Sequence, residues 1–351
     1  MTVPITLANS TPITYEITID RLPVLTYDRP VAIVTNPTVW GLHGDFLLKR
    51  ITAPTVEVIE VPDGEEYKQL ETVVSILDRL FEARFDRKSL LIAFGGGVIG
   101  DMTGLTASLY QRGIDFVQIP TTLLSQVDAS VGGKTGVNTA WGKNLIGAFY
   151  QPKAVHIDPH FLGTLPEREF AAGVAEVIKM AVMFDADFFR FLQENDLRSE
   201  RGIREMIRRS VELKAWVVNQ DEKEAGIRAV LNYGHTFGHV IENETNYTTY
   251  LHGEAVAIGI VMANALAVEL GLLSLQASDA IRNLLKHNGL PTTYSIENID
   301  AFYDHFYLDK KSHQGVITFV LPGGAIGSHV RRNDIDEATV KRALASWEVS
   351  S

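Results

Sequence analysis

The first half of this 351-residue chain alternates short runs of β-branched residues with segments of helical periodicity. We expect strands at 31–34, 56–61, 89–94 and 116–120, and a helix at 70–83, where apolar residues recur at helical spacing. Strands that alternate with helices predict a parallel sheet with helices on both faces, a Rossmann-like α/β arrangement. Ligands of such sheets bind beyond the carboxyl ends of the strands, so we expect a binding site at that edge.

The pattern becomes mainly helical after residue 166. Helices are predicted at 167–183, 186–194, 200–219, 234–245, 253–270 and 275–288, and the apolar run 316–321 predicts a strand that pairs with 325–330. We therefore predict an α/β N-terminal domain at 1–162 and a mainly α-helical C-terminal domain at 163–351. The apolar stretch 255–273 is interrupted by Asn264 and Glu269, which favours a buried helix over a membrane span.

The composition limits the chemistry that the chain can support. It has no cysteine, so a metal must be held by His, Asp or Glu, and the lack of thiols fits a reducing compartment. The net charge of −11 argues against non-specific binding to nucleic acid or to an anionic membrane. The N-terminus shows no basic region followed by an apolar run, so we expect no signal peptide and a cytoplasmic enzyme.

The third predicted strand runs directly into the glycine-rich segment Gly95–Asp101, and a helix is expected from about Met102. Glycines let the backbone approach a pyrophosphate, which the N–H groups and the positive end of a following helix attract. The spacing differs from the Gly-x-Gly-x-x-Gly fingerprint, and tight packing of a strand on a helix explains the glycines equally well.

Two further segments predict anion binding. Segment 120–150 sets Lys134 and Lys143 among small and hydroxyl side chains, which together can surround an anion, although a solvated loop is the alternative. Arg228 has a fork of donors that suits a carboxylate.

A group of histidines and a glutamate predicts a metal site. Glu176 lies in a predicted helix, His235 and His239 are four residues apart on one helical face, and His252 follows at the start of another helix. Two histidines and one carboxylate form a common three-ligand zinc site that leaves one position open for chemistry. Spacing alone would pair His235 with His239 and leaves the third ligand open.

In their order along the chain, these segments resemble those of the 3-dehydroquinate synthase family. The resemblance extends from Val31 to Leu321 and is carried by 63–68, 95–101, 111–113, 120–134, 142–144, 176–179, 228–239, 251–254 and 309–311.

The resemblance implies a role for each matching residue. It implies a zinc or cobalt ion on Glu176, His235 and His252, and it places His239 beside the substrate. NAD-binding residues would be Asp63, Glu65, Lys68, Gly97, Val98, Ile99, Gly100, Asp101, Thr121, Thr122, Lys134, Lys143, Phe161, Leu162, Gly163 and Thr164. Catalytic groups would be Asp128, Lys179, Lys214, Arg228, Asn232 and His239, and substrate contacts would come from Arg112, Lys134, Lys143, Asn144 and either Lys310 or Lys311.

The resemblance also implies a dehydroquinate synthase-like fold, a homodimer, and a lyase of the shikimate pathway toward chorismate and the aromatic amino acids. Such enzymes convert 3-deoxy-D-arabino-heptulosonate 7-phosphate into 3-dehydroquinate and phosphate. The steps are transient oxidation by NAD, elimination of phosphate, reduction and an intramolecular aldol closure. Three alternatives remain, namely another sugar phosphate cyclase that acts on sedoheptulose 7-phosphate, a metal-dependent polyol dehydrogenase that releases NADH, and an inactive relative.

Overall fold

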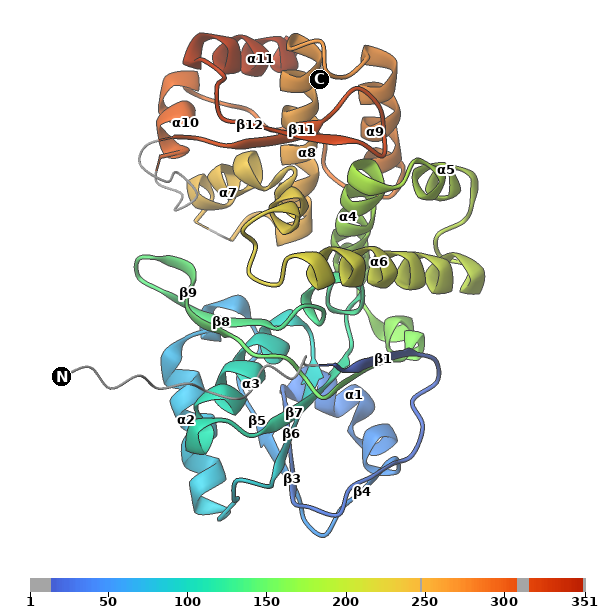
Figure 1. Cartoon of the computed structure of the whole chain (residues 1–351), viewed down its shortest axis with the longest axis vertical. Helices are drawn as coiled ribbons and strands as arrows, with labels where there is room; N and C mark the ends of the chain where they lie inside the picture. Colours follow the sequence, from blue (N-terminus) through green and yellow to red (C-terminus); the bar gives the residue numbers. More distant parts are fainter. Residues whose placement is uncertain (1–13, 247, 308–315, 350–351) are drawn as a thin grey trace, which may run out of the picture.

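The computed structural model describes residues 14–246, 248–307 and 316–349. It consists of an α/β half, formed by the chain up to about residue 157, and a mainly helical half from residue 167 onward (Figure 1). The 3-10 helix η4 (Pro159–Thr164) connects the two. This arrangement confirms the predicted fold class.

The α/β half is built on a six-stranded sheet whose order is β1-β10-β7-β6-β3-β5 and whose strands are all parallel. The strands are β1 (Glu16–Ile19), β3 (Val31–Thr35), β5 (Val56–Glu60), β6 (Leu90–Gly95), β7 (Asp115–Pro120) and β10 (Ala154–Ile157). Every residue of β3 and β6 is buried, as expected of strands covered on both faces. The chain reverses its direction across the sheet between β3 and β6, which marks the expected ligand position.

Helices cover both faces of the sheet because alternate strand residues point in opposite directions. Ala32, Val34 and Leu91 pack under α2 (Leu70–Glu82) and α3 (Gly97–Leu109). Ile33 and Ile92 face α1 (Pro37–Leu48) on the other side. The remaining short elements are β2 (Leu25–Thr26), β4 (Ile51–Thr52), η1 (Glu65–Tyr67) and η2 (Tyr110–Arg112).

The helical half packs around α8 (His252–Glu269). Its other elements are α4 (Glu167–Phe184), α5 (Ala186–Glu194), α6 (Glu200–Gln220), η5 (Ile227–Asn232), α7 (His235–Glu244), α9 (Leu275–His287), α10 (Ile299–His305), α11 (Glu337–Val349), β11 (Phe319–Pro322) and β12 (His329–Arg332). Two glycines bring α8 close to its neighbours, since a Cβ on Gly253 would lie 2.0 Å from the carbonyl oxygen of Ala172, and one on Gly259 would lie 2.1 Å from that of Gly234.

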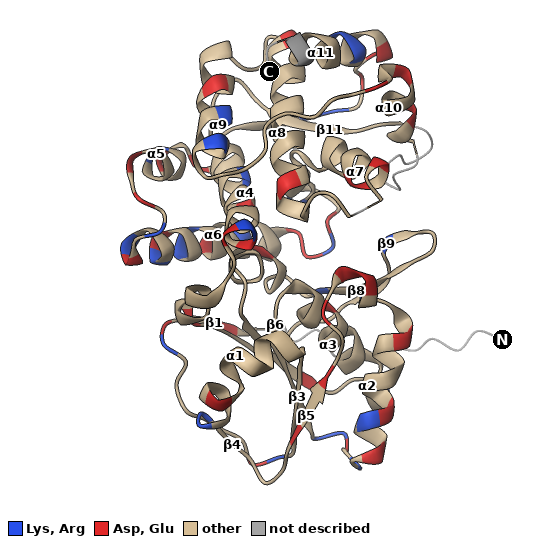
Figure 2. Cartoon of the chain, turned by 180° about the vertical axis from the view of Figure 1, so that it is seen from behind, with Lys and Arg blue, Asp and Glu red and all other residues tan. Residues whose placement is uncertain are grey.

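Among the described residues, α8 is the one helix long and apolar enough to cross a membrane by length and composition, yet 78% of that window is buried inside the protein. Figure 2 shows it in the middle of the helical half, in contrast to α6, whose surface carries charges of both signs. It is therefore a core helix, as the interruptions at Asn264 and Glu269 predict.

The predicted strands and helices are confirmed to within a few residues, with two differences. Helix α3 begins at Gly97 rather than near Met102, because the glycine-rich segment already forms the first turns of the helix. A Cβ on Gly100 would lie 2.8 Å from Oε1 of Gln118, so this glycine allows close packing of α3 on β7. Segment 120–150 folds into the π-helical turn η3 (Ser125–Ala129) and a hairpin of β8 (Lys134–Thr139) and β9 (Gly142–Phe149), rather than an irregular loop.

Candidate active site

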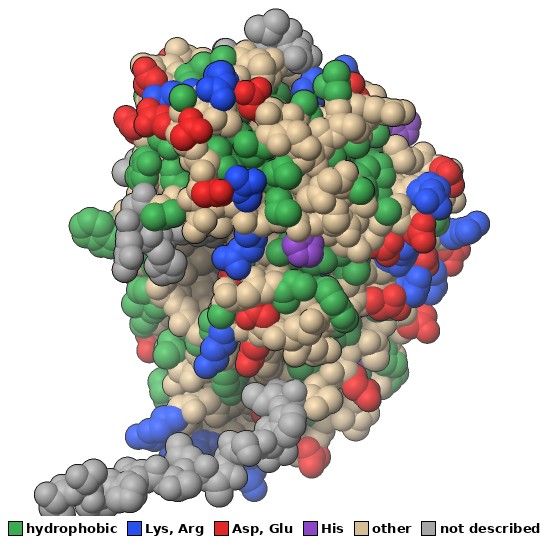
Figure 3. Space-filling view, turned by 45° about the horizontal axis from the view of Figure 1, so that its top comes forward, with side chains coloured by type: hydrophobic (Ala, Val, Ile, Leu, Met, Phe, Trp, Pro, Cys, Tyr) green, Lys and Arg blue, Asp and Glu red, His purple; other side chains and the backbone are tan. Residues whose placement is uncertain are grey.

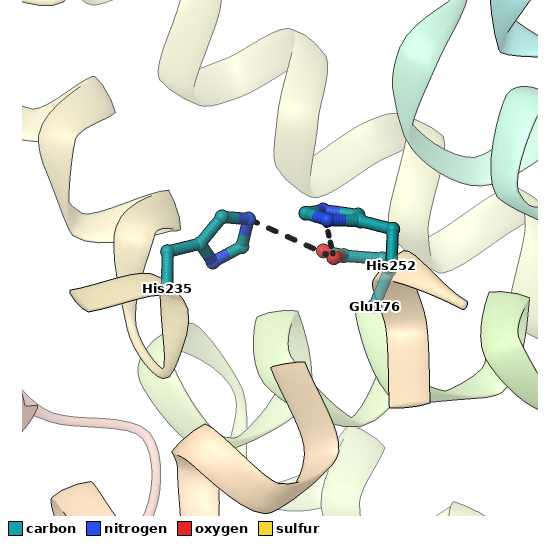
Figure 4. A group of neighbouring side chains, drawn as sticks. All are labelled: Glu176, His235 and His252. Carbon is teal, nitrogen blue, oxygen red and sulfur yellow. Dashed lines mark ion pairs between the residues drawn. The ribbon is translucent and has the colours of Figure 1, made fainter. Parts of the chain in front are cut away.

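Three helices bring Glu176, His235 and His252 together (Figure 4). Glu176 lies in the middle of α4, whereas His235 and His252 are the first residues of α7 and α8. Gly234 turns the chain into α7 with a φ of 80°, and a Cβ there would lie 2.7 Å from the side chain of Ile260. The position that starts α7 can therefore be occupied without strain only by glycine.

The geometry of these three side chains fits a divalent metal ion. Nε2 of His235 lies 3.8 Å from Oε1 of Glu176, and Nε2 of His252 lies 3.6 Å from the same oxygen. A tetrahedral zinc ion with bonds of about 2.0–2.1 Å separates its ligand atoms by about 3.4 Å. Glu176 is fully buried, and its Oε1 accepts no hydrogen bond from the described residues. A buried carboxylate oxygen without a partner is costly, and a metal ion would satisfy it.

Each histidine is oriented through its second ring nitrogen. His252 Nδ1 lies 3.2 Å from Oε1 of Glu242, and His235 Nδ1 lies 3.2 Å from the carbonyl oxygen of Tyr233. Both acceptors place the proton on Nδ1, which leaves Nε2 as the metal-binding atom. Burial raises the pKa of Glu242, but His252 and Lys143 beside it outweigh burial and hold the pKa well below its usual range.

His239 lies beside the three side chains but outside the group that could hold one ion. Its ring centroid is 5.5 Å from that of His235 and 6.4 Å from that of His252. Spacing alone would have paired His235 with His239, whereas the structure groups His235 with His252. The assignment of individual ligands remains a prediction.

A buried group of charges adjoins the metal position. Asp128, in η3, forms an ion pair with Lys214 of α6, and Lys214 Nζ also donates to the Asp128 carbonyl oxygen at 2.5 Å. Lys179 Nζ lies 4.0 Å from Oδ2 of Asp128 and pairs with Oε2 of Glu176. Burial raises the pKa of Asp128, but Lys214 and Lys179 lower it by more, so the pKa lies below its ordinary value. Asp128 is therefore a carboxylate held between two ammonium groups.

Arg228 is buried near carboxylates that form no direct ion pair with its guanidinium. Its side chain is 1% exposed, and its guanidinium donates to the carbonyl oxygens of Gly132, at 3.0 Å, and of Glu222. Among the described residues this guanidinium has no ion pair within 4.0 Å, although burial lowers its pKa and the nearby carboxylates of Glu224, Asp128 and Asp221 raise it in part. These carboxylates compensate the burial of the charge only in part, so an external anion would stabilise the guanidinium further.

Glu224 bridges two residues that the sequence assigned to the substrate. Its carboxylate pairs with Lys134 of β8, and its Oε1 accepts a hydrogen bond of 2.6 Å from Asn232. Glu224 itself has a positive φ of 63°, which is unusual for a residue other than glycine. An acidic side chain thus touches polar groups that could bind the substrate.

Several predicted NAD-binding residues lie just beyond the carboxyl ends of the strands. Asp63 follows β5 and accepts a hydrogen bond of 2.8 Å from Asn36, which follows β3. Lys68 forms an ion pair of 2.6 Å with Asp101 and donates to Oδ1 of Asn144 at 2.6 Å. Burial lowers the pKa of Lys68, but Asp101 and Glu65 together raise it by more. These residues surround the point between β3 and β6 where the chain reverses its direction across the sheet.

Other members of the predicted NAD set are placed differently. Phe161 and Leu162 are buried in the hydrophobic core, so only their backbone could contact a ligand. The Thr164 hydroxyl is hydrogen-bonded to Nε2 of His43 at 2.7 Å, and the hydroxyls of Thr122 and Ser125 are hydrogen-bonded to each other at 2.9 Å. Glu65 accepts a hydrogen bond of 2.8 Å from Asn138 of β8.

Comparison with known proteins identifies the family. The model of the 3-dehydroquinate synthase N-terminal region matches residues 58–172, and that of the C-terminal region matches residues 173–312. The 3-dehydroquinate synthase of Sulfurovum sp. (strain NBC37-1) is 72% identical over 348 residues, which cover 99% of each chain. The chain belongs to the 3-dehydroquinate synthase family.

Solved structures of related enzymes share the fold. A 2-epi-5-epi-valiolone synthase from Streptomyces hygroscopicus subsp. jinggangensis 5008, with NAD+ and Zn2+ bound, has a TM-score of 0.86 and 28% identity, with coverage of 99% of this chain and 100% of that one. A 2-deoxy-scyllo-inosose synthase complexed with carbaglucose-6-phosphate, NAD+ and Co2+ has a TM-score of 0.80 and 24% identity, with 91% of each chain covered, and shows the fold alone.

Arg112, which matches one of the 3-dehydroquinate synthase motifs, does not lie with the site residues described above. Arg112 follows α3 and precedes β7, so it lies at the opposite end of α3 from Gly97, about 20 Å away for a helix of this length. Among the described residues, no hydrogen bond or ion pair links its side chain to Asp128 or Glu224. Lys310 and Lys311 lie outside the described residues, so the choice between them stays open.

Two acidic residues of the candidate site are not predicted by the sequence patterns. Glu242 lies seven residues after His235 and three after His239, which is the spacing of one helical face, and this signal could have identified it. Glu224 lies in the charged segment 221–224 before η5, where nothing in the pattern distinguishes it from a solvated side chain.

Proposed function

We propose that this chain is a 3-dehydroquinate synthase that converts 3-deoxy-D-arabino-heptulosonate 7-phosphate into 3-dehydroquinate and phosphate. The relative at 72% identity carries that name over nearly the whole of both chains, whereas the valiolone-forming relative shares 28%.

The observation that carries the proposal is the buried Arg228, whose guanidinium forms no direct ion pair among the described residues. Two of its donors are taken by carbonyl oxygens, and the remaining donors of the fork could bind a carboxylate. The heptulosonate has such a carboxylate, and sedoheptulose 7-phosphate does not. This residue therefore favours the dehydroquinate reaction over that of the other sugar phosphate cyclases.

Two groups would have to bind before reaction. Bound NAD would supply a hydride acceptor that is later regenerated, and bound zinc or cobalt would supply a Lewis acid that favours ionisation of the hydroxyl to be oxidised. Glu176, His235 and His252 would hold the metal, and the residues around Asp63, Lys68 and Gly97–Asp101 would hold the nucleotide. The relative with bound NAD+ and Zn2+ supports this pairing.

The remaining residues would bind and orient the substrate. Lys134, Lys143 and Asn144, together with Lys310 or Lys311, supply cationic or polar groups for the phosphate, and Lys214 and Arg228 supply cations for the carboxylate. Lys179 contacts both Glu176 and Asp128, so it links the metal position to the charge group. His239 and Asn232 lie where they could move or hold a proton. Fixed charges in a buried site would keep one flexible substrate in reactive poses.

On the visible part of the face in Figure 3, acidic and basic side chains are intermixed rather than gathered into one basic surface. The cations that favour an anionic ligand are instead those buried between the two halves, among them Lys179, Lys214 and Arg228. This distribution suits a small anion rather than a polymer.

We also propose a cytoplasmic homodimer whose domains meet near 162 and 163. The family resemblance supports the dimer, and the position of Arg112 far from its own chain's site would suit a contact across it. The η4 segment between the sheet and α4 supports the domain boundary. Light scattering after gel filtration would test the dimer, which a monomer mass at micromolar concentration would exclude.

The function is tested by incubating the pure protein with the heptulosonate phosphate, NAD and zinc, while phosphate and NADH are measured. Phosphate release with no net NADH is the expected result. Release from sedoheptulose 7-phosphate alone would indicate another cyclase, net NADH with a polyol would indicate a dehydrogenase, and no reaction with either would overturn the proposal.

A further inference from the structure

Glu242 occupies an unusual position between the two halves of the molecule. It lies in the last turns of α7, is 2% exposed, and its Oε1 meets both Nδ1 of His252, at 3.2 Å, and Nζ of Lys143, at 3.0 Å. Its Oε2 has no hydrogen-bond partner among the described residues. Lys143 belongs to the β8–β9 hairpin, which extends from the α/β half toward α7 (Figures 1 and 2).

Oε1 of Glu242 thus accepts hydrogen bonds from His252 of the helical half and from Lys143 of the α/β half. The hydrogen bond from His252 holds the ring in the form whose Nε2 faces Glu176. The ammonium of Lys143 draws electron density from the same oxygen, which weakens that oxygen as an acceptor for His252. Lys143 also adds a positive charge near the position of a metal cation, and the two charges repel each other.

We propose that Glu242 is a positioning residue that couples anion binding at Lys143 to metal binding at His252. An anionic ligand such as the pyrophosphate of a dinucleotide would draw Lys143 away from Glu242. Glu242 would then be left to His252 alone, and the metal would be held more tightly. This inference rests on the proposed function, because it takes Glu176, His235 and His252 as the metal ligands.

Coupling of this kind is reciprocal. If the nucleotide tightens metal binding by some factor, the metal must tighten nucleotide binding by the same factor. The enzyme would then assemble its two cofactors together, and a half-loaded enzyme would be disfavoured. Lys143 and Glu242 are 99 residues apart in the sequence, so only the folded structure brings this link to light.

The test measures zinc affinity by competition with a chromophoric chelator, with and without saturating NAD, on wild type, Glu242→Gln and Lys143→Met. In wild type, NAD should tighten zinc binding about 5-fold or more. Glu242→Gln should weaken zinc binding about 10- to 100-fold and remove the effect of NAD. Lys143→Met should bind zinc at least as tightly as wild type without NAD, and NAD should no longer change the affinity.

The chain offers matched controls for both variants. Glu244 lies on the same helix and accepts a bond of 3.1 Å from Nδ1 of His305, away from the metal position, so Glu244→Gln should bind zinc as wild type does. Lys153 pairs with Asp115 at 3.4 Å and is 59% exposed, so Lys153→Met should keep the effect of NAD.

The outcomes separate this inference from the proposed function. Zinc affinity of Glu242→Gln within twofold of wild type, or an equal loss in Glu244→Gln, would overturn the coupling. Since Lys143 lies in an exposed hairpin, Lys143→Met decides the matter even if Glu242→Gln does not fold, and a retained effect of NAD in it would also overturn the coupling. If His235→Ala leaves zinc affinity unchanged, the metal assignment itself fails.

Discussion

The metal position and the charge group beside it are built in different ways. Glu176, His235 and His252 all come from helices of one half, and their close approach depends on glycines that let α4, α7 and α8 pack tightly. The charge group, taken here together with the neighbouring Lys134, Glu224 and Arg228, spans both halves. Asp128 and Lys134 come from the α/β half and meet Lys214 and Glu224 of the other.

This difference separates two tasks. A metal site contained in one packed core can keep its geometry while the halves move, whereas a substrate site shared between halves exists only when they are together. Changes to the metal ligands should therefore affect metal and substrate alike, and changes to charges that touch no metal ligand, such as Arg228, should affect the substrate alone.

The largest effect is expected from removing a metal ligand. Glu176→Ala should lower turnover by about 10³-fold or more, because a metal ion supplies several kcal/mol and each 1.4 kcal/mol is tenfold in rate. A chelator should have the same effect on wild type, and added zinc or cobalt should reverse it. Glu167→Ala, on the same helix but 84% exposed at its side chain, is the control and should keep full activity. Full turnover by metal-free wild type would refute the metal role.

A smaller effect is expected when the charge group loses its arginine. Arg228→Ala should raise KM for the heptulosonate phosphate by about 10- to 100-fold, since a hydrogen bond to a charged group contributes about 1.5–3 kcal/mol. Binding of NAD and zinc, measured by calorimetry, should stay the same. Arg228→Lys keeps the positive charge but loses the forked guanidinium, so its KM should lie between those of wild type and Arg228→Ala. Equal loss of NAD and substrate binding would remove Arg228 from the carboxylate site.

Asp128 should make the stability of the protein depend on pH. The pKa of Asp128 is lowered in the folded protein, because Lys214 and Lys179 outweigh burial. Its stabilising contribution is therefore fully present above about pH 4 and is lost as the pH falls further. Urea unfolding of wild type and Asp128→Asn should give a stability difference that shrinks as the pH falls below 4. A difference that stays constant with pH would contradict the ion pairs.

The smallest effect concerns the support of His235. Tyr233 presents its carbonyl oxygen to His235, and its hydroxyl donates to Oδ1 of Asn264 at 2.5 Å within the core. Tyr233→Phe should cost about 1 kcal/mol of unfolding free energy, because Asn264 loses a buried partner. Tyr233→Phe combined with Asn264→Leu should recover much of that loss. Strict additivity of the two changes, measured by urea unfolding, would show that the pair does not act together.

Sequence patterns predicted the elements that are defined by local periodicity. Strands β3, β5, β6 and β7 and the helices α2 and α4 to α9 follow from apolar spacing, which is why their bounds agree closely with the structure. Strands β1 and β10 of the same sheet were not predicted. The β8–β9 hairpin could not be predicted, because its glycines and polar residues give no alternation and its pairing depends on contacts with α3. Strand β1 joins the sheet through β10, a contact that no local pattern encodes.

The site was predictable where the chemistry of single residues is distinctive. Histidines and a glutamate suggested the metal, but spacing could not choose between His239 and His252, since the choice depends on how α7 and α8 pack. Glu242 shares a helical face with His235 and His239, a signal that was available but weak, whereas Glu224 looks like an ordinary surface charge and only its contact with Lys134 reveals it.

The most direct test of this account is a spectroscopic titration of the cobalt-loaded protein. If the metal and the charge group share one substrate, adding the heptulosonate phosphate should change the visible spectrum of cobalt. The same change in Arg228→Ala should require about 10- to 100-fold more substrate. A cobalt spectrum that stays unchanged at a substrate concentration that saturates turnover would contradict the account, because it would separate the metal from the reaction.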